Sequence, residues 1–360
     1  MRVLSFAVLL LAAASAGAQK LPVLLAARRL GPIQAYDPHT LQLIGSIDLY
    51  FGLESISVSN DGRRLFLAEA RDSGPEDPGG GLYALDLQTD RMCQFSGTGM
   101  FVVPSPDGRF LFTQGPHGVE VFDAATLSQA PPMRASGAYN LQPSPDGRWL
   151  LGISNSPKWS LAMFDLEQLR LSHQLVFPDG PITGAWDGET LEVLSYTPPG
   201  IVQVWSVRPG ETRLREPRRI EVPDLHAICN EPVLLTLAGA SGHLFLAEAF
   251  GYKVDRRNQC PGTVTGGIYT IDVANGSARH IAPSVHVSRL IAAPDGDLYV
   301  VDSPTRVAHG NARLLRLDGR TGGILSSALL GAGAWSLTYA RIPYGLLRPE
   351  LVHPVPNCER

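Results

Sequence analysis

The sequence carries little excess charge of either sign, and it has no long hydrophobic run. Lys and Arg together number 30 against 34 Asp and Glu, which gives a formal net charge of -4 over 360 residues. Proteins that bind nucleic acid or anionic membrane surfaces usually carry a strongly basic patch, so neither partner is expected. The most apolar stretch, residues 3–14, is shorter than the roughly 20 residues that span a bilayer. We therefore expect no membrane span.

Motifs for catalysis and metal binding are also missing. The sequence has no Cys-x-x-Cys-His, no His-Glu-x-x-His, no Gly-x-Ser-x-Gly and no phosphate-binding loop. Its 9 histidines are scattered, and a lone His is more often a hydrogen-bonded structural residue than a ligand. We therefore predict no cofactor and no metal. Whether the protein is an enzyme stays open, with a non-catalytic role favoured.

The N-terminus has the features of an exported protein. Met1 and Arg2 precede the apolar stretch, and Ala16-Gly17-Ala18 supplies small residues for a cleavage site before Gln19. These features predict a signal peptide over residues 1–18. Arg far outnumbers Lys in a chain rich in Ala, Gly and Pro, which suggests a GC-rich bacterial genome. The expected location is the periplasm or the medium.

One short sequence motif recurs along the chain and indicates its architecture. A polar turn centred on glycine, usually Asp-Gly, is flanked by alternating apolar residues, and an apolar run ending in Asp follows most copies. Asp-Gly is expected to supply the positive backbone angles of a tight hairpin. The turn glycines, 39 to 54 residues apart, are Gly62, Gly108, Gly147, Gly188, Gly242 and Gly296. This period with short apolar strands is typical of propeller blades.

The two ends of the chain complete one further unit. Residues 23–27, 32–37 and 41–47 have the pattern of the second, third and fourth strands of a blade, and residues 334–341 have that of a first strand. We therefore predict an all-β, seven-bladed β-propeller over residues 19–343, with a closing blade built from both termini. Residues 344–360 are predicted to form a C-terminal tail. Such closure removes exposed sheet edges.

Two features resemble a known group of proteins: the motif Ser105-Pro106-Asp107-Gly108-Arg109-Phe110-Leu111 and the third strands that end in Asp. With these features the chain resembles, over nearly its whole mature length, seven-bladed propellers of the YVTN-repeat and quinoprotein amine dehydrogenase-like group. The resemblance implies the propeller fold. Because the group includes lactonases, dehydrogenase subunits and binding scaffolds, it leaves the activity open.

Propeller geometry predicts which face carries a site. We call the face with the tight turns the lower face, and the opposite face, with the connections between second and third strands, the upper face. Three of these connections are long (71–80, 249–266 and 303–311), and long loops are often functional, although they can also be solvated decoration. First strands should begin around the channel mouth on the upper face. The residues predicted there as ligand-binding are Glu54, Asn140, Thr183, Arg289 and Trp335.

Two functional hypotheses follow. The first is an exported propeller that binds a small molecule, a glycan or a protein through its upper face without chemistry. The alternative is an enzyme of lactonase or dehydrogenase-subunit type with a metal or quinone partner at the channel mouth. Glu69 and Glu248 occupy equivalent Leu-Ala-Glu-Ala phrases near this face, where a structural role is favoured over coordination of a hard cation.

The four cysteines all follow the predicted cleavage site. An even number of cysteines in an exported chain favours disulfides. The blade assignment puts Cys229 and Cys260 together on the upper face. It puts Cys93 at the start of the fourth strand of blade one, just past a lower turn, and Cys358 on the tail that leaves the closing blade at the lower face. We therefore predict the pairs Cys229–Cys260 and Cys93–Cys358.

Overall fold

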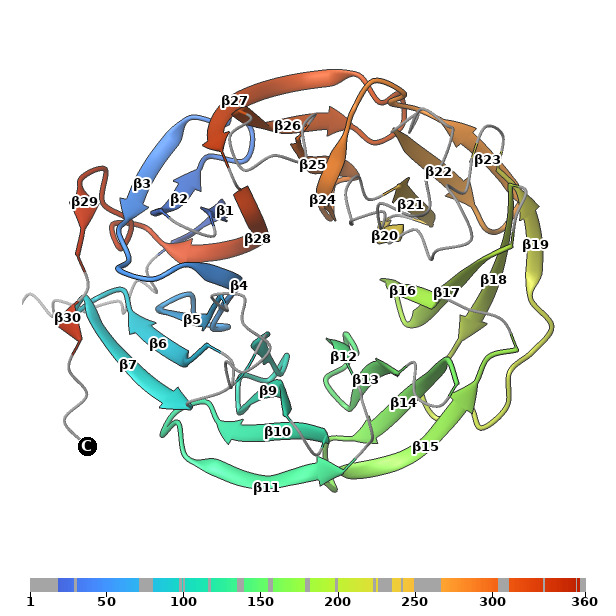
Figure 1. The fold of residues 1–360 in the computed structure, drawn as a ribbon, viewed down its shortest axis with the longest axis horizontal. Helices are drawn as coiled ribbons and strands as arrows, with labels where there is room; N and C mark the ends of the chain where they lie inside the picture. The colour runs from blue at the N-terminus through green and yellow to red at the C-terminus, as the bar shows by residue number, and fades with distance from the viewer. Residues whose placement is uncertain are drawn as a thin grey trace, which may run out of the picture.

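The computed structural model describes residues 19–28, 31–70, 80–96, 99, 101–115, 118–134, 139–154, 158–178, 182–197, 200–222, 225, 235–240, 242–248, 267–303, 311–332, 334–353 and 355–356. Within these ranges the regular secondary structure consists of β-strands alone. The strands form seven sheets that stand as blades around a central axis (Figure 1). The predicted all-β, seven-bladed β-propeller is confirmed. No described element is a helix long and apolar enough to cross a membrane.

Each blade has four antiparallel strands, called inner, second, third and outer from the axis outward (Figure 1). Blade 1 begins with β4, blades 2 to 6 follow in chain order, and blade 7 closes the ring. The inner strands are β4 (Leu53–Val58), β8 (Val103–Pro104), β12 (Tyr139–Pro143), β16 (Ile182–Asp187), β20 (Leu235–Ala240), β24 (Val287–Ala292) and β28 (Ala334–Pro343). The second strands are β5 (Arg64–Glu69), β9 (Phe110–Gly115), β13 (Trp149–Ser154), β17 (Thr190–Thr197), β21 (His243–Glu248), β25 (Asp297–Asp302) and β1 (Lys20–Arg28).

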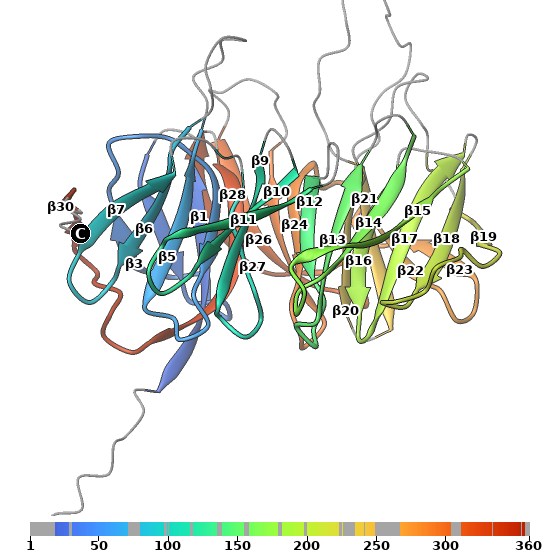
Figure 2. The ribbon, with the colours of Figure 1, turned by 90° about the horizontal axis from the view of Figure 1, so that it is seen from below.

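The remaining strands form the outer half of each blade. The third strands are β6 (Leu82–Asp86), β10 (Gly118–Asp123), β14 (Ser160–Asp165), β18 (Ile201–Val207), β22 (Ile268–Asp272), β26 (Asn311–Asp318) and β2 (Ile33–Tyr36). The outer strands are β7 (Arg91–Ser96), β11 (Gln129–Arg134), β15 (Arg170–Val176), β19 (Arg218–Glu221), β23 (Ser277–His280), β27 (Ile324–Ala332) and β3 (Leu43–Ile47). Figure 2 shows the blades standing side by side as one thick disc.

Blade 7 joins the two ends of the described chain. Strand β28 pairs antiparallel with β1 from Lys20 opposite Pro343 to Arg28 opposite Ala334, as the sequence predicts. The C-terminal segment then adds two short strands, β29 (Leu351–Val352) parallel to β3 and β30 (Val355–Pro356) parallel to β7. The predicted tail therefore covers the outer edges of two neighbouring blades (Figure 1).

The hydrophobic core consists of seven layers, one between each pair of neighbouring blades. Between blades 7 and 1, for example, Leu25 and Ile33 pack in one cluster with Leu53 and Leu67. Because second and third strands are buried on both faces, they are apolar runs rather than alternating strands. Each fully buried aliphatic or aromatic side chain contributes roughly 1.5–3 kcal/mol.

The repeated turn at the lower face is held by a serine and an aspartate. Ser59 Oγ donates to Asp61 Oδ1 at 2.6 Å, and the backbone N–H of Arg63 donates to the same oxygen at 3.0 Å. Blades 2 and 3 repeat the contact between serine and aspartate. Gly62 has a φ of 75°, whereas Asp61 is not among the residues with positive φ. The positive angle therefore falls on glycine alone, which corrects the expectation for Asp-Gly as a pair.

The aspartate that ends most third strands closes the next turn. Asp123 Oδ1 accepts hydrogen bonds from Thr126 N at 2.7 Å and from Thr126 Oγ1 at 2.9 Å. Equivalent bonds to threonine occur at Asp37 and Asp86. This local Asx turn explains why an apolar run ends in Asp so regularly.

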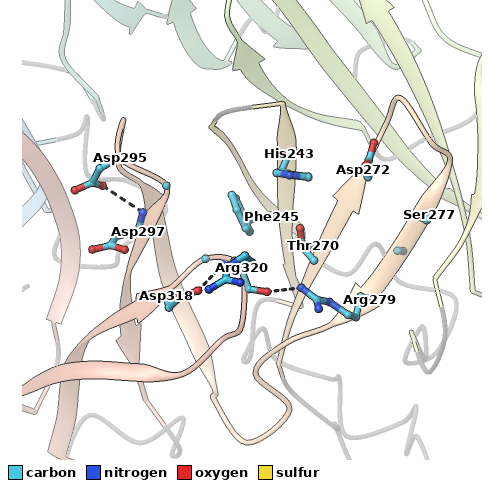
Figure 3. A pocket seen from close by; sticks show the side chains of 13 residues that line it. His243, Phe245, Thr270, Asp272, Ser277, Arg279, Asp295, Asp297, Asp318 and Arg320 are labelled. Atoms are coloured by element: carbon cyan, nitrogen blue, oxygen red, sulfur yellow. Dashed lines mark hydrogen bonds between the residues drawn. The ribbon is translucent and has the colours of Figure 1, made fainter.

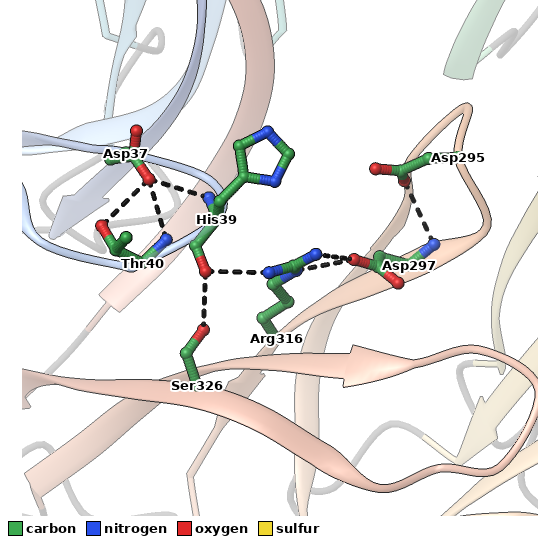
Figure 4. Close-up of polar contacts among 7 residues, drawn as sticks. All are labelled: Asp37, His39, Thr40, Asp295, Asp297, Arg316 and Ser326. Atoms are coloured by element: carbon green, nitrogen blue, oxygen red, sulfur yellow. Dashed lines mark hydrogen bonds and ion pairs between the residues drawn. The ribbon is translucent and has the colours of Figure 1, made fainter.

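Arginines connect the lower turns of neighbouring blades. Arg64 of blade 1 donates to the carbonyl oxygen of Ala124 in blade 2 at 3.1 Å. Arg316 of blade 6 donates to the carbonyl oxygen of His39 in blade 7 at 2.9 Å, and it forms an ion pair with Asp297 at 2.5 Å (Figure 4). The lower face is therefore fixed by bonds within and between blades.

Candidate ligand-binding site

The structure places all five predicted ligand-binding residues near the upper ends of inner strands. Each is the second or third residue of its strand: Glu54 in β4, Asn140 in β12, Thr183 in β16, Arg289 in β24 and Trp335 in β28. Asn140 is exposed, and Glu54, Thr183 and Arg289 are half-buried. The side chain of Trp335 lies outside the described part of the chain.

Four inner strands have a β-bulge at this same end. In β4, Leu53 faces Glu69 and Ser55 faces Ala68, so Glu54 is an extra residue without a partner in the ladder. Trp335 in β28 and Ser288 in β24 are extra residues in the same way. The fourth bulge lies in β12, between Tyr139 and Gln142, and includes Asn140. We call the four residues Glu54, Asn140, Ser288 and Trp335 the bulge ring.

The bulges favour a site at this end. A bulge removes a residue from the regular alternation, and bulges are common beside active sites because they redirect side chains. Asn140 also has a φ of 51°, a backbone conformation that non-glycine residues adopt rarely and that often marks functional positions. Thr183 lies in a regular part of its ladder and does not share this feature.

Arg289 follows the bulge in β24 directly. Its Nη1 donates to the carbonyl oxygen of Ser288 at 3.0 Å, so the guanidinium folds back over the bulge. Ser288 itself was not predicted from the sequence. Only the register with β25 identifies it as an extra residue, and nothing in the residue type indicates that register.

Hydrogen bonds also link neighbouring inner strands further along their length than the bulges. Thr338 Oγ1 of β28 donates to the carbonyl oxygen of Ile56 in β4 at 2.7 Å. Gln142 Nε2 of β12 donates to the carbonyl oxygen of Gly184 in β16 at 2.8 Å. These bonds cross from blade to blade, so they fix neighbouring inner strands relative to one another. A rigid support of this kind keeps a binding site preorganised.

The carboxylates at the ends of second strands have structural partners. Glu69 Oε2 accepts hydrogen bonds from Gly81 N at 3.0 Å and from Tyr83 Oη at 3.2 Å. Burial, and then the Glu69 charge, raise the pKa of Tyr83 to about 12. These contacts favour the structural interpretation of Glu69. The side chain of Glu248 lies outside the described residues.

Asp302 occupies the same position in blade 6 and was missed by sequence reasoning. Its side chain is only 1% exposed, and Oδ2 accepts from Arg313 Nη2 at 2.6 Å. Its Oδ1 accepts from the backbone N–H of His286 at 2.9 Å. The repeat position shared with Glu69 was the available signal. Within the described residues, no three His, Cys, Asp or Glu side chains gather closely enough to hold a metal ion.

A cavity of about 580 Å³ opens on the opposite, lower face between blades 5 and 6 (Figure 3). Its walls include His243, Arg279 and Arg320, and Phe245 lies at its back. Several of its carboxylates already have partners. Asp318 accepts from Thr321 N at 2.8 Å, and Asp297 is paired with an arginine. We interpret this cavity as a gap between satisfied turns.

The cysteines and long loops are only partly described. Cys93 lies in β7 and takes part in a disulfide bond. Its three possible partners, Cys229, Cys260 and Cys358, lie outside the described residues, and both predicted pairings remain predictions. The interiors of the three long connections also lie outside the described part, so their role remains an expectation.

Comparisons with known proteins support the fold. No protein-family model and no curated protein matches the chain. The structure is similar to Kuenenia stuttgartiensis hydrazine synthase, with a TM-score of 0.58 and 15% identity over 83% of this chain and 97% of that chain. It is also similar to a putative 6-phosphogluconolactonase from Bacteroides uniformis, with a TM-score of 0.60 and 13% identity over 89% of this chain and 100% of that chain.

A third similar structure is the dihydro-heme d1 dehydrogenase NirN, with a TM-score of 0.51 and 14% identity over 90% of this chain and 75% of that chain. At these identities the likeness shows the propeller fold and nothing finer. The YVTN-repeat and quinoprotein amine dehydrogenase-like group therefore remains a resemblance of the sequence.

Proposed function

We propose that this protein is an exported β-propeller that binds a polar ligand at the upper end of its axis, through the bulge ring and the adjoining Arg289. The observation that carries the proposal is the position of the bulges. Four extra residues occur in four different blades, all at the start of the inner strand. Register shifts also occur between the third and outer strands of five blades, but these four lie in the strands nearest the axis and at the same end of them.

The chemistry of these residues favours a polar ligand over an apolar one. A carboxylate, an amide, a hydroxyl and a guanidinium provide both hydrogen-bond donors and acceptors in one region. This combination suits a small polar molecule, a glycan or a polar protein segment. No residue of this set needs to form a covalent bond for such a role.

The binding proposal is tested by screening sugars, sugar acids and amino acids for thermal stabilisation of the mature protein. Any compound that raises the unfolding temperature is then titrated by calorimetry into Glu54→Gln and Asn140→Ala. Glu189→Gln is the matched control, because Glu189 is an exposed carboxylate in the lower turn of blade 4. We expect at least tenfold weaker binding in the first two variants only. Equal affinity in all variants contradicts the proposal.

The second candidate is an enzyme of lactonase or dehydrogenase-subunit type acting at the same place. It is supported by the names of two structural neighbours, a putative 6-phosphogluconolactonase and the dihydro-heme d1 dehydrogenase NirN, and by the Glu54 carboxylate. An assay of the hydrolysis of gluconolactone and its 6-phosphate, monitored by the release of protons, tests lactonase activity. Elemental analysis tests for bound metal. Turnover or stoichiometric metal that is lost in Glu54→Gln favours the enzyme.

Export is the other part of the proposal. The ladder begins at Lys20, the second residue after the expected cleavage site, and the carbonyl oxygen of Gln19 accepts a hydrogen bond from Tyr344 N at 2.9 Å. Cleavage of a signal peptide over residues 1–18 would therefore leave strand β1 complete. N-terminal sequencing after expression in a bacterium tests it. We expect Gln19 as the first residue in the periplasm, and an uncleaved cytoplasmic chain contradicts export.

A further inference from the structure

Arg28 ends the second strand of blade 7 at the upper face, beside the bulge ring. In blades 1, 6 and 7 the last residue of the second strand pairs with the residue that precedes the bulge of the inner strand. These last residues are Glu69, Asp302 and Arg28. Glu69 and Asp302 accept hydrogen bonds within their own blades. Arg28 occupies the equivalent place without such bonds.

The guanidinium of Arg28 has no hydrogen-bond or ion-pair partner among the described residues. Its Nε is buried and has no hydrogen-bond partner, whereas its two Nη atoms are not buried in this way. No described carboxylate forms an ion pair with it. Burial of part of a charged group without a partner costs free energy. An anion in contact with the Nη atoms would offset this cost.

Two glycines leave room for the Arg28 side chain. A Cβ atom at Gly31 would lie 3.2 Å from Arg28 Cδ, and a Cβ atom at Gly331 would lie 3.2 Å from Arg28 Cζ. Both distances are shorter than an ordinary van der Waals contact. Because Gly331 belongs to β27 of blade 6, the guanidinium of blade 7 lies against the backbone of the neighbouring blade.

Arg28 and Arg289 lie on facing sides of blades 7 and 6. Leu24 and Ala26 precede Arg28 on one side of β1, and both pack in the core layer between these two blades. Val301 packs in the same layer, and Arg289 lies opposite Val301 in the ladder, so these two side chains share a face. Two guanidinium groups therefore border the upper end of this layer.

The two carboxylates described at the upper ends of these blades have other partners. Asp302 follows Val300 on the side of β25 that packs toward blade 5, and it is already paired with Arg313. Asp48 Oδ2 lies 3.5 Å from His353 Nδ1, in the C-terminal segment at the outer edge of blade 7. Neither carboxylate neutralises Arg28, so the upper end of the boundary between blades 6 and 7 carries positive charge.

We propose that Arg28 binds the anionic group of a ligand, a carboxylate or a phosphate, at the upper end of the boundary between blades 6 and 7. The two Nη atoms form a planar fork that can donate to two oxygens of either group. Arg28 pairs with Ala334, the residue before Trp335 of the bulge ring. The inference rests on the proposed binding site and narrows its ligand to an acid.

Inorganic phosphate, added at constant ionic strength, tests the proposal on the mature protein. Because a ligand of the folded state stabilises it, we expect phosphate to raise the unfolding temperature of the wild-type protein. We expect no rise in Arg28→Met. Arg213→Met is the matched control, because Arg213 is an exposed arginine in the lower turn of blade 4, and it should respond as the wild type does. No rise in the wild-type protein, or a rise that persists in Arg28→Met, overturns the proposal.

Arg28→Lys keeps the charge but removes the fork, and it decides the question if Arg28→Met does not fold. By calorimetry we expect Arg28→Lys to bind phosphate at least fivefold more weakly than the wild type does. Affinity equal to that of the wild type overturns the proposal. Acetate, titrated in the same way, identifies the chemical group: the anion that binds the wild type more tightly is the one that the site prefers.

Glu54→Gln separates this inference from the proposed function. Glu54 belongs to blade 1, so this variant should bind phosphate as the wild type does. Loss of phosphate binding in Arg28→Met, together with an unchanged affinity of Glu54→Gln for every compound of the thermal screen, would support the anion site and contradict only the role of the bulge ring. Loss of phosphate binding in Glu54→Gln and its retention in Arg28→Met would overturn the anion site.

Discussion

Single side chains close the lower turns of the propeller, and their charge makes the fold sensitive to acid. Partial burial alone would raise the pKa of Asp107, but hydrogen bonds from Ser105 and from the backbone N–H of Arg109 outweigh it and lower this pKa below the ordinary value of 3.8. The pKa of Asp61 is lowered in the same way. At Asp123 the hydrogen bonds from Thr126 are the main cause of a lowered pKa.

Stability should therefore fall in acid. A carboxyl group whose pKa is lower in the folded state stabilises the fold above its unfolded pKa, and this stabilisation disappears as the pH falls through the folded pKa. We expect the urea concentration at the midpoint of unfolding to decrease once the pH falls below about 4. In this range Asp residues of the unfolded chain bind protons before those of the folded chain. Asp107→Asn should weaken the fold at neutral pH and reduce the acid dependence. Glu189→Gln, the control, should change neither.

Glu69 provides a second test at the scale of one residue. Its carboxylate is adjacent to Tyr83 Oη, and it adds to the effect of burial in raising the pKa of Tyr83 to about 12. Glu69→Gln should lower this pKa, although burial should keep it above the ordinary value of 10.0. NMR titration of ring-labelled tyrosine measures it. An unchanged pKa would mean that Glu69 is not the partner.

Strands and turns were largely predictable from the sequence because each has a local signal. Gly62 marks a turn through the bond that its backbone N–H donates to the carbonyl oxygen of Ser59, and Asp123 marks another through the bond that its carboxylate accepts from Thr126 N. Bulges depend on register between strands, so Ser288 has no local signal. The short strands β29 and β30 also escaped prediction, since each has only two residues and pairs with a strand far away in the sequence.

The C-terminal strands predict a disulfide at the scale of elements. Val355 lies opposite Arg91 and Pro356 opposite Met92, so β30 ends two residues before Cys358 in the sequence and beside the residue that precedes Cys93. We expect Cys93 to be bonded to Cys358, and Cys229 to Cys260. Non-reducing peptide mapping checks both pairs, and any cross-pairing contradicts the blade assignment. Cys358→Ser should lower the free energy of unfolding by about 3–5 kcal/mol, because it opens a long loop.

At the scale of the whole molecule, closure of the ring by β1 and β28 aligns seven inner strands with their starts on one face. This arrangement brings together residues that are up to 281 positions apart, such as Glu54 and Trp335. The sequence predicts this gathering once the blade repeat is recognised. The cavity between blades 5 and 6 was not predictable, because it depends on how turns of two blades fit together.

We place a ligand at the upper bulge ring and interpret the lower cavity as a gap between turns, so a bound compound tests both assignments. A crystal structure of the mature protein soaked with a compound that stabilises it in the thermal screen distinguishes them most directly. We predict that the compound lies at the upper end of the axis, within hydrogen-bond distance of Glu54 or Asn140. Density in the lower cavity beside His243 and Arg320, with none at the bulge ring, would contradict the account.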